Sequence, residues 1–315
     1  APQILPTGVD RTQTMCHHSD MFRQTESIPP DEKTDLNRSL LRALSVLKLF
    51  SPTSLELSVT EVSRRSGLPI ATAFRILATL TQAGFLDKDE RSGKYRIGPE
   101  TYMAGNLYLR TNDLLQAAGP VIRLVNELTE DVCGLSVLEK GYQVLLMREE
   151  SRHTFRFAQT TGLGFPAYAI SAGKALLSTM TDQELDELYP DEALTPLTPN
   201  TITTKSKLKA ELSTVRQTGV AFNREESRLS VTSVAAVVRD VEGRAVAGVT
   251  VSYPTFRVDV ERERLYTGLI RAAADVISHR LGYREEGARA ENLDDLRRWW
   301  REHGGETSTP LAAAP

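Results

Sequence analysis

Cysteine is scarce in this chain of 315 residues, which contains only Cys16 and Cys133. The two lie far apart, Cys16 in a polar segment and Cys133 in an apolar run. This spacing argues against a framework of disulfides, and so few cysteines are typical of a protein from a reducing compartment. We therefore expect a cytoplasmic protein.

Long apolar runs are missing as well. No run approaches the roughly 20 residues that a membrane-spanning helix needs, and residues 1–35 show no basic region followed by an apolar one. The sequence thus predicts neither a membrane span nor a secretory signal. Residues 1–35 lack apolar periodicity and are rich in Thr, Pro, Asp and Glu, so we predict a flexible arm there.

Signatures of catalysis and of metal binding are also absent. The five histidines are scattered without ligand spacing, and no Gly-x-Ser-x-Gly motif marks a nucleophile. Gly173 and Lys174 are followed by Ala175, where a phosphate-binding loop needs Ser or Thr. We expect no enzyme, no metal and no cofactor, and we interpret Lys174 as a packing residue at a helix start or as a surface residue.

Charge is nearly balanced over the whole chain, with a net value of −3. Residues 36–97 nevertheless hold ten Lys and Arg residues against five Asp and Glu residues, a local charge of 10 − 5 = +5, which leaves −3 − 5 = −8 for the rest. A basic module joined to an acidic body is typical of a domain that contacts nucleic-acid phosphates. The alternative is a set of charges that only keep the surface solvated.

The basic module begins with residues 37–50, where Leu40, Leu44 and Leu47 recur at helical spacing. We predict an amphipathic helix with these side chains on its buried face and Asn37 as its N-cap. A second short helix follows, with Thr60 as its predicted cap and Gly67 at its end.

A third helix is predicted between Pro69, which suits a first helical turn, and Gly84, which stops the helix. Its apolar side chains recur at helical spacing and predict a buried stripe. A second set of residues projects from the opposite side of the helix. The stripe consists of Ala73, Ile76, Leu77 and Leu80, and the opposite set of Ala71, Thr72, Arg75 and Thr79. Residues 85–98 alternate about the turn "ERSGK" and predict a β-hairpin. Three helices and a basic hairpin predict a winged helix-turn-helix.

Helical periodicity continues through residues 99–130 and predicts a connecting helix and then a docked helix. Beyond it, strands are predicted over residues 132–139, 143–149, 153–158, 219–223, 232–240 and 244–254, and helices near 171–180, 182–188, 205–217 and 259–281. Hairpins and helices without βαβ alternation predict an α+β sheet domain. Near the end, Leu293, Leu296, Trp299 and Trp300 predict one short amphipathic helix.

Several motifs, taken together, resemble the IclR family of bacterial transcription regulators. The segments "RSLLRALSVLKLF", "TEVSRRSGLPIATAFRILATLTQAGFL" and "GKYRIG" are similar to its DNA-binding domain, and "GFPAYAISAGKALLS" and "VTSVAAVVRDVEGRAVAGVTVS" to its effector domain. The resemblance runs from about Arg38 to Tyr283. With it we divide the chain into a flexible arm (1–35), a winged helix-turn-helix DNA-binding domain (36–98), a linker helix (99–115), a GAF-like effector-binding domain of sheet and helices (116–283) and a tail (284–315).

The sequence departs from the family's pattern in four places. Ile70 and Ala71 stand where the recognition helix often begins with Lys or Arg and then Ser. Tyr168 replaces a frequent histidine, Ser230 a glycine and Val237 a proline. The first departure bears on the preferred DNA sequence, and the other three bear on the ligand.

For DNA binding, the third helix is expected to enter the major groove. There Arg75 can donate to a phosphate or to guanine, and Thr72 can form hydrogen bonds or offer its methyl group. Ile70 and Ala71 can contact thymine methyl groups. Phosphate contacts are expected from basic residues on the other elements, namely Arg38, Arg64, Arg65, Lys88, Arg91 and Lys94.

The resemblance places the effector site against the sheet of the second domain. Carried over residue by residue, its polar positions are Asn223, Ser233, Thr250 and Ser252, and its wall is Ala169, Ile170 and Ser171. The four polar groups are neutral and repel no anion, which favours a small organic or aromatic acid.

The sequence as a whole predicts a ligand-responsive transcription regulator, with a double-stranded DNA operator and a small-molecule effector as partners and no membrane partner. The resemblance implies a homodimer or homotetramer. Two alternatives stay open: an enzyme that uses the second domain's pocket, and a sensor or scaffold whose winged helix binds protein. Repression and activation are equally compatible with the sequence.

Overall fold

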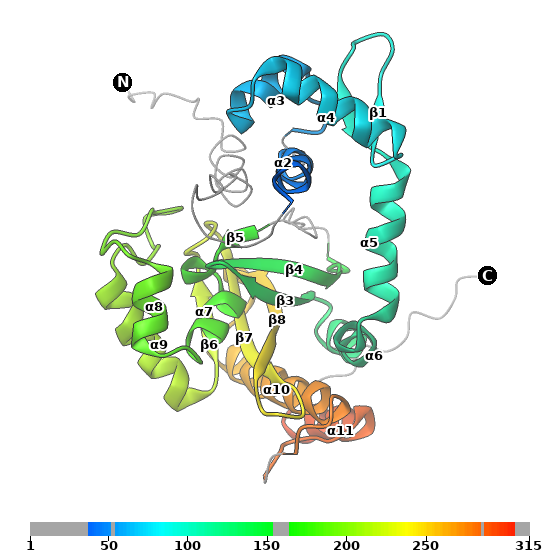
Figure 1. Cartoon of the computed structure of the whole chain (residues 1–315). Coiled ribbons are helices and arrows are strands. Elements are labelled where there is room, and N and C mark those ends of the chain that lie inside the picture. Colours follow the sequence, from blue (N-terminus) through cyan, green and yellow to red (C-terminus); the bar gives the residue numbers. More distant parts are fainter. Residues whose placement is uncertain (1–36, 52–53, 154–163, 285–286, 306–315) are drawn as a thin grey trace, which may run out of the picture. The chain divides into compact units, whose positions relative to one another are not determined.

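The computed structural model describes residues 37–51, 54–153, 164–284 and 287–305 (Figure 1). The chain divides into two compact units, residues 1–111 and residues 112–315, which are described one at a time. Within the described ranges, no helix is long and apolar enough to cross a membrane.

Unit 1 has the winged helix-turn-helix architecture that the sequence predicts. Its helices are α2 (Arg38–Leu47), α3 (Val59–Ser66), α4 (Ile70–Gln82) and α5 (Pro99–Thr111), and its hairpin consists of β1 (Leu86–Lys88) and β2 (Tyr95–Ile97). The two strands are antiparallel, with Leu86 opposite Ile97 and Lys88 opposite Tyr95. Backbone hydrogen bonds between Leu57 and Tyr95 in both directions attach the hairpin to the helices.

Capping residues explain where these helices begin and end. The Asn37 side chain accepts hydrogen bonds from the N–H groups of the first turn of α2, as predicted. The prediction of Thr60 as the cap of α3 is wrong, because Ser58 caps this helix. Ser58 and Glu61 form a reciprocal capping box, in which each side chain accepts from the other residue's backbone N–H. Gly67 ends α3 in the left-handed conformation, with φ of 68°.

The core of unit 1 lies between α2, α3, α4 and the hairpin. Its buried members include Val46, Phe50 and Val62, together with Leu77 of the predicted α4 stripe. The predicted buried face of α2 is wrong at its first turns, because Leu40 and Leu44 are 57% and 44% exposed. From α2 itself, Val46 and the half-buried Leu47 join this core, and Leu49 and Phe50 join it just after the helix ends.

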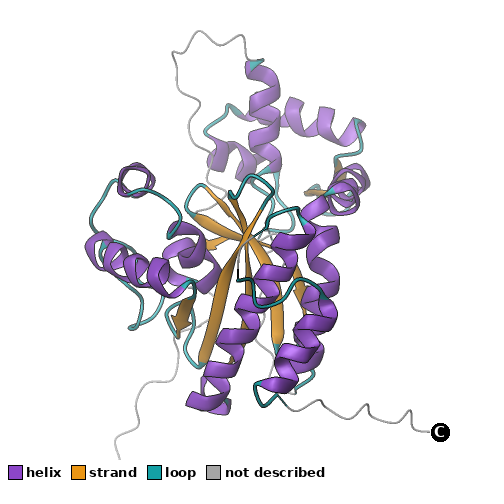
Figure 2. Cartoon of the chain, turned by 90° about the horizontal axis from the view of Figure 1, so that it is seen from below, coloured by secondary structure: helices purple, strands orange, loops and turns teal. Residues whose placement is uncertain are grey.

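Unit 2 is an antiparallel sheet covered by helices on both faces (Figure 2). Its strands are β3 (Val132–Glu139), β4 (Tyr142–Glu149), β5 (Gly164–Pro166), β6 (Ala221–Arg224), β7 (Val231–Arg239) and β8 (Ala245–Pro254), in the order β5-β4-β3-β8-β7-β6. Its helices are α6 (Asp113–Thr129), η1 (Ala167–Ala169), α7 (Ser171–Leu177), α8 (Asp182–Leu188), α9 (Lys205–Thr218), η2 (Thr255–Arg257), α10 (Val260–Arg280) and α11 (Leu293–Glu302). This confirms the α+β class.

The two faces of the sheet differ in what covers them. On one face, Cys133, Val234 and Val251 pack against α6 and α10 in the main core, and burial raises the pKa of the Cys133 thiol. On the other face, Ala221 and Ala235 pack against α7. We call this second side the α7 face. Directly opposite residues in an antiparallel sheet share a face, so strand register identifies its other members.

Helix α11 confirms the predicted amphipathic helix and belongs to the core. Trp300 is fully buried and stacks on Tyr266 of α10, with ring centroids 6.3 Å apart. A Cβ atom on Gly268 would lie 2.3 Å from the Trp299 ring, so the absence of a side chain there lets α11 approach α10. Of the strand predicted over residues 153–158, only His153 lies within the described residues, and the predicted arm lies outside them.

Candidate DNA-binding surface and effector site

Helix α4 presents its predicted reading side to solvent. Ala71, Arg75 and Thr79 are exposed and Thr72 is half-buried, while Ala73 and Leu77 fill the core behind them. Because 3.6 residues make one turn, these two sets fall on opposite sides of the helix. The arrangement leaves one face of α4 available to a partner.

The residues predicted to contact phosphates are exposed, except Lys94, which is half-buried. They lie on three elements: Arg38 on α2, Arg64 and Arg65 on α3, and Lys88, Arg91 and Lys94 on the hairpin and its turn. The Arg65 guanidinium donates to the Ser54 hydroxyl at 2.7 Å. Unit 1 therefore combines a solvent-facing helix with scattered exposed cations.

Asp89 shapes the basic turn of the hairpin. Its carboxylate accepts hydrogen bonds from the backbone N–H groups of Arg91 and Ser92, at 2.7 and 2.8 Å. These bonds hold the pKa of Asp89 below its ordinary value. Gly93 completes the turn with φ of 66°. The turn thus has a fixed shape built from local hydrogen bonds.

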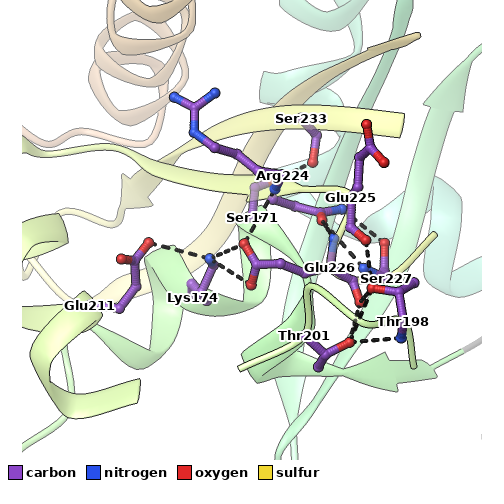
Figure 3. Close-up of polar contacts among 11 residues, drawn as sticks. Ser171, Lys174, Thr198, Thr201, Glu211, Arg224, Glu225, Glu226, Ser227 and Ser233 are labelled. Carbon is purple, nitrogen blue, oxygen red and sulfur yellow. Dashed lines mark hydrogen bonds and ion pairs between the residues drawn. The ribbon is translucent and has the colours of Figure 1, made fainter. Parts of the chain in front are cut away.

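In unit 2, the predicted effector residues come together where η1 and α7 meet the α7 face. Asn223, Ser233 and Ser252 lie side by side on three neighbouring strands, because Ser233 is opposite both of the others. The Ser171 hydroxyl, at the first position of α7, lies 2.7 Å from the Ser233 hydroxyl (Figure 3). Ala169 and Ile170 are buried immediately before α7.

Thr250 belongs to the next row of the same face. It lies opposite Gly134 of β3 and donates to the Gly134 carbonyl at 3.3 Å. Arg148 of β4 is the other partner of Gly134, so its side chain shares this face. The Arg148 side chain is only 6% exposed and its Nε lies 2.8 Å from the Glu150 carboxylate. Arg148 was not among the residues expected at this site, because its strand register is not written in the sequence.

The structure explains both residues of the Gly173–Lys174 motif. A Cβ atom on Gly173 would lie 2.2 Å from the Ala167 carbonyl oxygen, so only glycine allows η1 to fold against α7. Lys174 is 1% exposed and its ammonium donates to both carboxylate oxygens of Glu226, at 2.7 and 2.9 Å (Figure 3). Glu211 of α9 is a second partner, at 3.3 Å. The interpretation of Lys174 as a surface residue is therefore wrong.

Side-chain hydrogen bonds hold the loop that follows β6 in place. Asn223 accepts from the backbone N–H of Glu226 at 2.8 Å and donates to the Ser227 hydroxyl at 2.8 Å. The Glu226 carbonyl accepts from the Thr201 hydroxyl at 2.6 Å. Asn223 thus uses most of its hydrogen-bonding capacity inside the protein, and Ser233, Thr250 and Ser252 carry the polar character of the α7 face.

Tyr168, one of the departures in the sequence, is buried in η1. Its hydroxyl donates to the Thr195 carbonyl at 2.8 Å, and burial raises the pKa of Tyr168 to about 12. Its ring meets Tyr189 edge to face, with centroids 5.8 Å apart. These contacts fix the neutral Tyr168 phenol, which in turn holds η1 beside the predicted site.

The described residues bring together no group of three metal-ligating side chains. The chemistry of the α7 face is that of neutral hydroxyl groups beside one arginine. Such groups bind and orient a small polar molecule by hydrogen bonds and charge.

Two family models match the chain. The model of the bacterial transcriptional regulator IclR C-terminal domain matches residues 106–279, and the IclR helix-turn-helix domain matches residues 39–90. Among curated proteins, the HTH-type transcriptional repressor AllR of Escherichia coli is 28% identical over 245 residues, which span 78% of this chain and 90% of that protein.

Solved structures share the fold. An IclR transcriptional regulator from a Silicibacter species matches with a TM-score of 0.72 and 25% identity, covering 79% of this chain and 98% of that chain. An IclR homologue from Microbacterium hydrocarbonoxydans, complexed with 4-hydroxybenzoate, matches with a TM-score of 0.67 and 24% identity, covering 77% of this chain and 98% of that one.

Proposed function

The chain belongs to the IclR family of bacterial transcriptional regulators, and from this premise we propose that α4 and the hairpin bind the operator while a small organic acid on the α7 face alters that binding. The observation that carries the effector half is the 2.7 Å contact between Ser171 and Ser233. It joins the start of α7 to strand β7 among residues expected at the site.

On the DNA side, α4 enters the major groove, where Arg75 and Thr72 meet base edges and Ala71 a thymine methyl group. The phosphates are contacted by basic residues on α2, α3 and the hairpin, namely Arg38, Arg64, Arg65, Lys88, Arg91 and Lys94. The exposure of Arg75 supports this role, because a reading residue must reach its partner without unfolding its own domain.

On the effector side, the ligand's acid group accepts hydrogen bonds from Ser233 and Ser252, beside Thr250, whose hydroxyl donates to the Gly134 carbonyl. The wall of the site is Ala169, Ile170 and Ser171, and Asn223 holds the neighbouring loop. Arg148, whose guanidinium is paired with Glu150, shares this face with Thr250. Binding at this site shifts the population of states that fit the operator.

The wider setting is part of the same proposal. The protein acts in the cytoplasm as a homodimer or homotetramer, with an N-terminal arm (1–35), a DNA-binding domain (36–98), a linker helix (99–115), an effector domain (116–283) and a tail (284–315). It performs no catalysis. Turnover of a small acid by the purified chain would favour an enzyme instead.

A reciprocal pair of variants tests the proposal. Arg75→Ala should weaken binding to a duplex selected from a random library by about 5- to 150-fold, the effect of removing one base contact, and should leave ligand-dependent melting unchanged. Ser233→Ala should do the reverse. The ligand readout is the thermal shift in a panel of small organic and aromatic acids that begins with 4-hydroxybenzoate. Loss of both properties in either variant would contradict two separable sites.

A further inference from the structure

Helix α4 exposes two large apolar side chains. Ile70 is 56% exposed and Phe74 is 53% exposed. The two are four residues apart, so they lie on the same side of the helix, one above the other. Neither is needed to fill the interior, because Ala73 and Leu77 already occupy it.

The exposed surface of α4 is divided along its length. Since 3.6 residues make one turn, Ile70, Phe74 and Ala78 follow one side of it, and Arg75 and Thr79 follow the other. All five side chains are exposed. Thus α4 presents an apolar strip directly beside a strip of a cation and a hydroxyl.

The surroundings of the apolar strip indicate its occupant. Residues 36–97 carry a net charge of 10 − 5 = +5, which attracts a polyanion. In the major groove of DNA, the only apolar group on a base edge is the C5-methyl group of thymine, and aromatic side chains contact it. An exposed phenyl ring on a basic module therefore suits a thymine methyl group on a polyanion.

We propose that Phe74, together with Ile70, is a specificity-determining residue that contacts thymine methyl groups in the operator. This rests on the proposed DNA-binding role of α4. Phe74 would add a preference for a methyl group, which involves no hydrogen bond. Arg75 beside it contacts a hydrogen-bonding base edge or a phosphate.

Replacement of thymine by deoxyuridine tests the proposal, because it removes only the methyl group. The wild-type protein first selects a duplex from a random library at low salt, and each thymine of that duplex is then replaced in turn. For the wild type, binding should weaken about fourfold at each contacted position, the factor expected from one buried methylene-sized group. For Phe74→Ala, the ratio between thymine and deoxyuridine should fall to one at one or more of these positions.

Two further variants make the result specific. Met103→Ala removes another side chain of unit 1 that is 50% exposed, on α5, and should keep the full ratio. Phe74→Leu should keep part of it, because it remains apolar. Thermal unfolding of Phe74→Ala should match the wild type, since the side chain is outside the core.

Three outcomes would overturn the inference. One is a wild-type protein that binds both duplexes equally at every position. Another is a Phe74→Ala protein that keeps the wild-type ratio; a simultaneous loss of self-association in sedimentation would then assign Phe74 to a contact between copies. The third is a wild-type protein that enriches no duplex at all, in which case the proposed DNA-binding function fails and this inference fails with it. The first two outcomes contradict only this inference and leave the proposed DNA-binding function intact.

Discussion

On α4, Arg75 and Thr79 face solvent, whereas in unit 2 Ser171, Lys174 and Ser233 are at most 4% exposed. There the Ser171 and Ser233 hydroxyls contact each other, and Lys174 pairs with Glu226 and Glu211. The first group is open to solvent, and its side-chain hydrogen bond, from the Thr79 hydroxyl to the Arg75 carbonyl, stays within the helix. The second consists of side chains that are already partners, joined by contacts between residues 37 to 62 positions apart in the sequence. The two regions therefore differ in their partners: the exposed face of α4 is available to a ligand, and the buried groups of unit 2 bind one another.

This difference predicts how each region responds to substitution. Exposed residues without shared partners contribute nearly independently, while members of one network are coupled by about 0.5–3 kcal/mol. Substitutions on α4 should therefore cost DNA affinity and little stability. Substitution of Lys174 in unit 2 should instead cost stability, because it breaks a buried ion pair.

The largest effect is expected for Lys174→Met. It leaves the Glu226 carboxylate buried without its cation, which costs about 3–5 kcal/mol in the free energy of unfolding. Both tryptophans of the chain, Trp299 and Trp300, lie in α11 of unit 2, so urea unfolding followed by tryptophan fluorescence reports on this unit.

The matched control is Arg75→Met, which removes a cation from the exposed face of α4. Arg75→Met should leave the same fluorescence transition in place. The double variant Lys174→Met/Glu226→Gln should recover part of the loss, because the stranded charge is gone. A Lys174→Met protein as stable as the wild type would remove the contrast between the regions.

The same glycine substitution in each unit gives the next largest contrast. Gly173→Ala places a Cβ atom 2.2 Å from the Ala167 carbonyl oxygen, and relief of that overlap should cost about 1–3 kcal/mol of stability. Gly105→Ala, on α5, meets nothing within 4 Å and should raise helix stability by up to about 1 kcal/mol. Far-ultraviolet circular dichroism during thermal unfolding measures both. Equal effects would show that the approach of η1 to α7 is not tight.

The smallest effect concerns pH. The Arg224 guanidinium pairs with Glu263 at 2.6 Å and holds the pKa of that carboxyl below its ordinary value of 4.5. The pair therefore stabilises unit 2 at pH values above 4.5, and the contribution is lost as the pH falls through the lowered pKa in the folded state. Because Arg224 is 57% exposed, we expect no more than about 1 kcal/mol.

Glu263→Gln should remove this part of the pH dependence in fluorescence-monitored urea titrations. Glu261→Gln, on the same helix with a side chain 87% exposed, is the control and should follow the wild type. If the two variants had the same pH profile, the ion pair would contribute nothing measurable.

Local patterns allowed much of the fold to be predicted. The Asn37 cap, the Gly67 stop and the stripe of α4 depend on neighbours within one or two turns, and the structure confirms them. The Ser58 cap was also visible as Ser-x-x-Glu, but Thr60 was closer to the apolar run. The error at Leu40 and Leu44 has another cause, since periodicity locates an apolar stripe without saying how much of its length finds a partner.

The network of unit 2 could not be predicted in the same way. Glu226 is 52 residues from Lys174, and Arg148 enters the α7 face only through strand register. Such contacts depend on tertiary packing, which carries no local signal. The contact of Gly173 could be predicted in part. A glycine indicates that another group approaches the backbone closely, but the sequence does not indicate that this group is the Ala167 carbonyl.

Helix α11 has a consequence for the order of events during synthesis. Trp300 completes the core that Tyr266 begins, yet it lies beyond residue 279, where the match to the family model ends. A ribosome that has released residues up to α10 has made every strand of the sheet, while the apolar end of that core is still open to water. Because domains fold as the chain emerges, unit 2 completes its core only after α11 has left the exit tunnel.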